Sequence, residues 1–161
     1  MVKTMVKLNA PVEKSFEVKG STGEELFAAL KKHGNAGVFR GYPHMEVAPS
    51  EDKIEAVKIG CDPTITLPEW KGAAKAEPKL KKGWQKTVDL ARKHEMAHFR
   101  DFKARMKTLI KEISKAETLD RAAIDKLILD MRLQGLKDRN DLHERRLDKD
   151  WSKIEKFLKG K

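Results

Sequence analysis

The second half of the chain repeats apolar residues at steps of three and four positions, the pattern of amphipathic helices. No proline occurs after residue 84, and β-branched residues are few there. The first of these runs predicts one long helix over about 84–115. Its apolar positions are Trp84, Val88, Ala91, Phe102, Met106, Leu109 and Ile113.

Two further helices are expected after it. Thr118 is a suitable N-cap for the first of them, and Gly135 is its expected stop. The apolar positions of that helix are Ile124, Leu127, Ile128, Met131 and Leu136. The last helix is expected over about 139–158, with Leu142, Leu147, Trp151, Ile154 and Phe157 as its apolar positions.

The first half has a different pattern. Alternation in "KSFEVKG" predicts a strand over 14–20 that ends at Gly20. In the following "STGEELFAALKKHG", Ser21 and Glu24 form a capping-box pattern and Gly34 is a suitable stop. This stretch therefore predicts a short helix.

Residues 37–67 carry the strand-like runs "VFRGYPHMEVA", "KIEAVKIG" and "TITLP", which prolines punctuate. They predict a small antiparallel sheet, and residues 69–83 lack periodicity and read as an exposed connection. The expected fold is α+β, with a small N-terminal antiparallel sheet and one helix, then three helices of which the first is long. We expect a single domain over 1–161, with sheet and helix in 14–68 and helices in 84–160.

The composition favours some kinds of binding partner and excludes some kinds of metal site. The 161 residues include 35 basic and 25 acidic side chains, for a net charge of +10, which suits an acidic partner, nucleic acid or an anionic surface. Aromatic residues make up only 6% and no RNA-recognition or zinc-finger signature occurs, which argues against nucleic acid. The single cysteine, Cys61, excludes an intramolecular disulfide and a cysteine-rich zinc site.

No stretch approaches the roughly 18–20 apolar residues of a membrane-spanning helix. The first residues, "MVKTMVKLNAPVEKSFEV", lack the apolar region of a signal peptide. The sequence predicts no membrane span and leaves the compartment open.

Residues 94–98 read HEMAH, an HExxH motif within the predicted long helix. His94 and His98 are four residues apart and project from one helical face, so both imidazoles can reach one metal ion. In zinc hydrolases with this motif the glutamate, here Glu95, takes the proton from the attacking water. The competing interpretation is a pair of surface histidines on an amphipathic helix.

A catalytic zinc site usually has three protein ligands and one open position. Asp101, seven residues after His94, shares its helical face and can bind metal or orient a histidine. His143 or Glu144, on the last predicted helix, would give a three-histidine or a His-His-Glu site. Position 101 is not glycine, so the metzincin pattern HExxHxxGxxH is absent.

Four stretches carry a family resemblance: "FEVKGSTGEELFAALKKHG", "TITLPEW", "GWQKTVDLARKHEMAHFRDF" and a histidine-bearing stretch near the end. Over about residues 15–155 the chain resembles a bacterial family of zinc-dependent proteases, catalogued as a domain of unknown function, with many exported members. The resemblance implies that His94 and His98 bind zinc and that Glu95 is the base.

The C-terminal part of that family carries Tyr-Asp followed by Thr-His-Gly. Here "DRNDLHERRL" places His143 where the family has its histidine, but the tyrosine and the glycine are missing. The resemblance makes His143 the preferred third ligand, with Asp101 and Glu144 as alternatives.

The leading hypothesis is a zinc-dependent metallopeptidase-like hydrolase that acts on a polypeptide. Zn²⁺ would be held by His94, His98 and His143, with Glu95 as the catalytic base. The alternative is a non-catalytic basic helical protein that binds an acidic partner or nucleic acid. A third possibility keeps the metal for structure alone. Zinc bound at about one ion per chain would exclude the non-catalytic binding protein and would fit both the hydrolase and the structural metal site.

Overall fold

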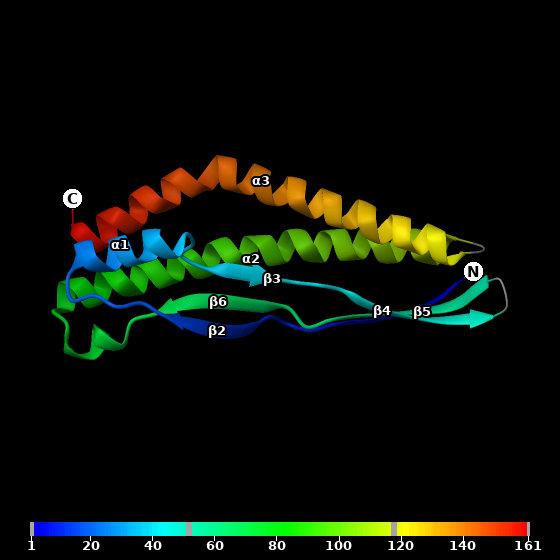
Figure 1. The fold of residues 1–161 in the computed structure, drawn as a ribbon, viewed down its shortest axis with the longest axis horizontal. Coiled ribbons are helices and arrows are strands. Elements are labelled where there is room, and N and C mark those ends of the chain that lie inside the picture. The colour runs from blue at the N-terminus through cyan, green and yellow to red at the C-terminus, as the bar shows by residue number, and fades with distance from the viewer. Residues whose placement is uncertain (1, 51–52, 117–118, 161) are drawn as a thin grey trace. The chain divides into compact units, whose positions relative to one another are not determined.

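Strands occupy the first half of the chain and long helices the second, so the α+β class is confirmed (Figure 1). A computed structural model describes residues 2–50, 53–116 and 119–160. In chain order the elements are β1 (Lys3–Leu8), β2 (Val12–Glu17), α1 (Gly23–His33), β3 (Val38–Arg40), β4 (His44–Ser50), β5 (Lys53–Cys61), β6 (Thr64–Glu69), a 3₁₀ helix (Lys71–Lys75), α2 (Pro78–Lys115) and α3 (Arg121–Lys159). The HExxH motif lies in α2, the long helix, as expected.

The strands form two three-stranded sheets of mixed direction, which corrects the expected small antiparallel sheet. In the first sheet, β5 lies between a parallel β1 and an antiparallel β4. In the second, β6 lies between a parallel β2 and an antiparallel β3. Alternation along a strand reports which side chains are buried, but it carries no information about the partner's direction.

The chain forms two compact units, and each is built from three separate segments. Unit 1 consists of Met1–Pro11, Gly41–Pro63 and Phe99–Asn140, and unit 2 of Val12–Arg40, Thr64–His98 and Asp141–Lys161. Each unit thus combines one sheet with one stretch of α2 and one of α3. The boundary does not follow the expected division into a sheet part and a helical part.

The core of unit 2 gathers all three tryptophans of the chain. Its buried members are Val18, Leu26, Leu30, Trp70, Trp84, Trp151, Ile154 and Leu158. The Trp70 and Trp84 rings meet edge to face with centroids 5.7 Å apart, and the Trp70 Nε1–H donates to the Gly20 carbonyl at 2.8 Å. Full burial of an aliphatic side chain such as Leu26 contributes about 2 kcal/mol. This core anchors the stretches of α2 and α3 that carry the histidines.

Helix α1 is capped one residue later than expected. Thr22, not Ser21, is the N-cap: its hydroxyl accepts from the Glu25 N–H at 3.2 Å, and the Glu25 carboxylate accepts from the Ser21 N–H at 2.6 Å. The capping box therefore uses Glu25 rather than Glu24, because the sequence offers two suitable hydroxyls and two glutamates in succession. Gly34 ends the helix with a positive φ of 85°, as expected.

Unit 1 has its own set of buried apolar residues, mostly on its strands and on both long helices. Its members are Val2, Ile54, Val57, Ile59, Cys61, Phe99, Phe102, Met106, Leu109, Ile113, Leu119 and Ile124. On β5, Val57, Ile59 and Cys61 are buried whereas Lys58 is exposed, which is the alternation of a strand with one covered face.

Helix α2 begins at Pro78, before the expected start at Trp84. Proline suits the first turn of a helix because its missing N–H would have no partner there. Part of the expected connection over 69–83 is therefore helical, and Lys71–Lys75 form a 3₁₀ helix.

One continuous helix, α3, replaces the two helices expected over 118–135 and 139–158. The expected stop at Gly135 was wrong: this residue is helical, and its φ is not positive. The missing side chain instead leaves room for Arg105, whose Nε would lie 3.2 Å from a Cβ at this position.

The start of α3 is capped by a different residue from the one expected. Thr118 lies outside the described residues. Asp120 directly precedes the helix, and its Oδ1 accepts a hydrogen bond from the Ala123 N–H at 2.7 Å. An aspartate in this position satisfies one of the free N–H groups of the first turn.

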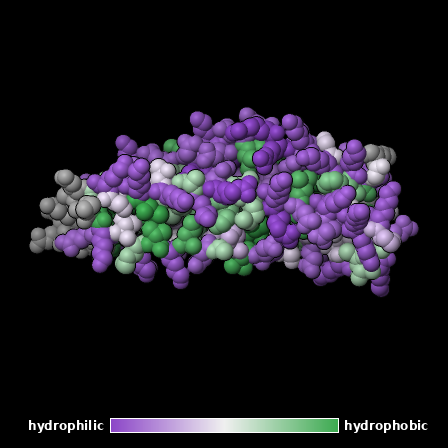
Figure 2. All heavy atoms as spheres, turned by 180° about the vertical axis from the view of Figure 1, so that it is seen from behind, coloured by the Kyte–Doolittle hydropathy of each residue, from purple (hydrophilic) through white to green (hydrophobic). Residues whose placement is uncertain are grey.

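Hydrophilic residues cover most of the surface seen in Figure 2, and hydrophobic residues appear in separate patches. Within the described residues, no helix is both long enough and apolar enough to cross a bilayer.

Candidate metal centre

The two histidines of the HExxH motif continue the buried stripe of α2 in unit 2. Thr87 and Ala91 are buried, and His94 and His98 follow at helical spacing with intermediate exposure. Two imidazoles thus occupy positions at which the helix would otherwise place core residues. Burying such polar groups is unfavourable unless they have partners.

His143 of α3 similarly continues an apolar stripe. Leu147, Trp151, Ile154 and Leu158 follow it at steps of three and four, and the last three are buried. In unit 2 the start of α2 packs closely against the end of α3. A Cβ at Gly83 would collide there with the Phe157 carbonyl oxygen. This packing brings the histidine of α3 to the pair on α2.

The three imidazoles form one cluster. Ring centroids are 5.0 Å apart for His94 and His98, 5.5 Å for His94 and His143, and 5.2 Å for His98 and His143. One nitrogen from each ring lies within 4.8 Å of the other two. Two nitrogens on a tetrahedral zinc ion are about 3.4 Å apart, so the rings need to converge by no more than about 1.4 Å.

A carboxylate holds one ring of the cluster. The Nδ1 of His94 lies 3.0 Å from Oδ2 of Asp150, and the two side chains are 10% and 17% exposed. A carboxylate only accepts hydrogen bonds, so this contact places a proton on Nδ1, and in the neutral imidazole the lone pair is then on Nε2. Ligand histidines of metal sites are commonly oriented in this way.

From the sequence, Asp101 was expected to bind metal or to orient a histidine, and Asp150 was given no role. The available signal was spacing, because Asp150 is seven residues after His143 and lies on the same face of α3. Asp101 belongs to unit 1, where it lines a groove. Glu144 is exposed on α3, and neither acid belongs to the histidine cluster within the described residues.

Glu95 is buried, with 5% of the residue exposed, and its side chain packs against the backbone just before β3. A Cβ at Gly37 would lie 2.9 Å from its Cγ and 3.0 Å from its Oε1, so a larger residue there would force the Glu95 side chain to shift. Burial raises the pKa of Glu95 to about 7, and a hydrogen bond from the Phe39 backbone acts in the opposite direction. A carboxyl group with such a pKa exchanges protons near neutral pH, as a general base requires.

Residues 13–153 match the family described as bacterial protein of unknown function. The chain belongs to this family, DUF922. His94, Glu95, His98, His143 and Asp150 of this DUF922 chain all lie within the matched residues. The expected membership of a bacterial family of unknown function is thereby confirmed. No curated protein and no solved structure matches the chain.

Proposed function

We propose that the chain is a zinc-dependent peptide hydrolase in which His94, His98 and His143 hold the metal and Glu95 is the general base. The observation that carries the proposal is the convergence of three imidazole nitrogens within 4.8 Å. Three nitrogen ligands leave the fourth position of a tetrahedral zinc ion open, which is typical of catalytic rather than structural sites.

The donor set suits zinc better than the harder divalent cations. Imidazole nitrogen is a favoured ligand of zinc and copper, whereas magnesium and calcium prefer oxygen. When bound, zinc supplies a Lewis acid that polarises a carbonyl group and lowers the pKa of water to about 7. The Asp150 carboxylate holds the His94 ring through Nδ1 and so leaves Nε2 as the atom that would bind the metal.

Glu95 handles the proton in this proposal. Its carboxylate removes a proton from the attacking water and later delivers it to the nitrogen of the leaving amine as the C–N bond breaks. Gly37 and the Phe39 backbone hold the carboxyl group in one place, so little reorganisation accompanies each transfer. The fixed position and the pKa of about 7 support the role.

The first test is the zinc content of protein purified without a histidine tag, loaded with zinc and then desalted. The proposal predicts about one zinc ion per chain in the wild type and its loss in His98→Ala and His143→Ala. His33→Ala is the matched control, because His33 is exposed at the end of α1, outside the cluster, and should leave the zinc in place. A zinc-free wild type would refute the proposal and favour a non-catalytic basic protein.

The second test is hydrolysis of a library of quenched fluorescent peptides. The zinc-loaded wild type should cleave members of the library, and Glu95→Gln should abolish cleavage without loss of zinc. Undiminished cleavage by that variant would refute the role of Glu95. Zinc bound at one ion per chain with no cleavage of any peptide would identify a structural metal site instead.

A further inference from the structure

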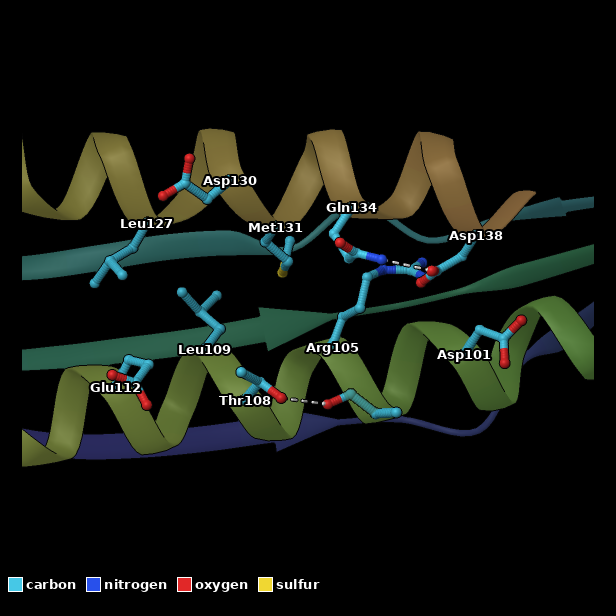
Figure 3. Close-up of a pocket in the computed structure, with 11 residues that line it drawn as sticks. Asp101, Arg105, Thr108, Leu109, Glu112, Leu127, Asp130, Met131, Gln134 and Asp138 are labelled. Carbon is cyan, nitrogen blue, oxygen red and sulfur yellow. Dashed lines mark hydrogen bonds and ion pairs between the residues drawn. The ribbon is translucent and has the colours of Figure 1, made fainter. Parts of the chain in front are cut away.

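A groove in unit 1 lies between the stretch 101–112 of α2 and the stretch 127–138 of α3 (Figure 3). Its volume is about 490 Å³. The residues that line it recur at steps of three and four on both helices, so each helix presents one face to the groove. At 1.5 Å per residue, each of these stretches is about 16 Å long.

The floor of the groove is apolar. Leu109 of α2 and Leu127 and Met131 of α3 point into the space between the two helices (Figure 3). Methionine adapts its shape to varied apolar partners. Such a floor suits apolar side chains of a ligand.

The rim of the groove carries four acidic side chains and one basic one. Arg105, the basic residue, is neutralised by Asp138, whose Oδ2 lies 2.7 Å from its Nη1. Asp101 and Asp130 form no ion pair with any described residue. The groove is therefore locally negative in a chain whose net charge is +10.

We propose that this groove binds a short peptide segment in which lysine or arginine alternates with apolar residues. About five extended residues span 16 Å, and the volume lies within the range of ordinary ligand pockets. Apolar side chains would cover Leu109, Leu127 and Met131, and the cations would face Asp101 and Asp130. The negative groove would bind a basic peptide, whereas the net positive charge of the whole chain would attract acidic partners.

The test uses the full chain and a fluorescein-labelled six-residue peptide that alternates one lysine with two leucines. Fluorescence anisotropy at low salt should show binding, and the same peptide with glutamate in place of lysine should bind at least about tenfold more weakly. This comparison needs no variant. Equal binding of the two peptides, or no binding of the lysine peptide, would overturn the proposal.

Charge-removing variants then locate the contact. Asp101→Asn with Asp130→Asn should weaken binding of the lysine peptide about tenfold, because neither side chain is needed for an ion pair within the protein. Glu55→Gln with Asp125→Asn is the control, since both acids are exposed in unit 1 outside the groove and the change of net charge is the same. Equal losses in both pairs would show that net charge alone attracts the peptide, and would overturn the site.

A third variant separates the groove from the metal centre. His98→Ala should leave the affinity for the lysine peptide unchanged, because His98 belongs to unit 2 and does not line the groove. Loss of peptide binding in His98→Ala would place the bound peptide at the metal centre instead, and would overturn the proposal.

Discussion

The Nδ1 atom of His94 on α2 lies 3.0 Å from Oδ2 of Asp150 on α3. Within unit 2 the two helices therefore share both the histidine cluster and the carboxylate that orients one of its rings. Such an orienting carboxylate strengthens metal binding. Replacing the partner of a ligand histidine typically lowers metal affinity roughly 10- to 100-fold.

Asp150→Asn should accordingly lower the affinity for zinc about 10- to 100-fold, measured by competition with a chromophoric chelator. Asp148→Asn is the matched control, since Asp148 is an exposed residue of the same helix. An unchanged affinity in Asp150→Asn would show that His94 needs no orienting partner.

Gly37→Ala should disturb Glu95 directly. The added Cβ would lie 2.9 Å from the Glu95 Cγ, and the resulting overpacking should cost about 1–3 kcal/mol in the free energy of unfolding. Peptide cleavage should fall with it, whereas zinc should stay bound, since no ligand moves.

The Glu95→Ala background provides the control for this steric conflict. Once the glutamate side chain is removed, Gly37→Ala should cost much less, which denaturant unfolding of the four proteins in a double-mutant cycle can measure. If the cost is the same in both backgrounds, alanine at position 37 is unfavourable for a reason other than its contact with the Glu95 side chain.

The histidine cluster could be predicted from the sequence for two reasons. HExxH is local, so His94, Glu95 and His98 could be read from one helical turn. His143 lies far away in the chain: it was a candidate together with Glu144 on the last predicted helix, and the family resemblance made it the preferred ligand. Asp150 and Gly37 act through contacts between distant segments, and an aspartate or a glycine at those positions has no distinctive local pattern.

The same distinction between local patterns and distant contacts applies to the fold. The stripes on Trp84, Ala91 and Met106 correctly predicted a long helix, because helical periodicity is local. The β1 strand was not expected, since its parallel partner β5 is some fifty residues away and Met5 and Val6 are exposed. Gly135 was taken as a helix stop although its role is to accommodate Arg105, a contact that only the packed helices reveal.

The Arg105–Asp138 pair should stabilise unit 1 in a pH-dependent way. Burial alone would raise the pKa of Asp138, but hydrogen bonds from Gln134 and Arg105, with the Arg105 charge, outweigh it and lower the pKa. A carboxyl group with a lowered pKa contributes stability above its unfolded pKa of about 4, and the contribution is lost as the pH falls through the folded value.

Asp138→Asn should therefore lower the free energy of unfolding by about 1 kcal/mol at pH 7, and by less as the pH approaches 3. Urea unfolding of both proteins at several pH values measures the difference. Asp130→Asn is the control, because Asp130 has no ion pair among the described residues. A difference independent of pH would mean that the pair does not supply the stability.

Cys61 should be unreactive in the folded protein. Burial raises the pKa of its thiol, the Asp62 charge raises it further, and a hydrogen bond from the Tyr42 backbone acts in the opposite direction. Because the thiolate is the reacting form, Ellman's reagent should modify Cys61 slowly at pH 7–8 until unit 1 opens. Fast modification of the native chain would contradict its burial.

The same thiol also reports on unit 1, whereas the three tryptophans all lie in unit 2. Since α2 and α3 run without a break through both units, Cys61 reactivity and tryptophan fluorescence should change at the same denaturant concentration. Two separate midpoints would show that the units unfold independently.

The assembly of each unit from three segments has a consequence for the chain as it leaves the ribosome. The last segment of unit 1 ends at Asn140, so all its pieces have been synthesised before unit 2 receives its last segment, Asp141–Lys161. His143 and Asp150 belong to that final piece. The newly made chain therefore carries HEMAH for some time without the third imidazole or its orienting carboxylate, and the set of histidines is complete only once this last piece of unit 2 has been made.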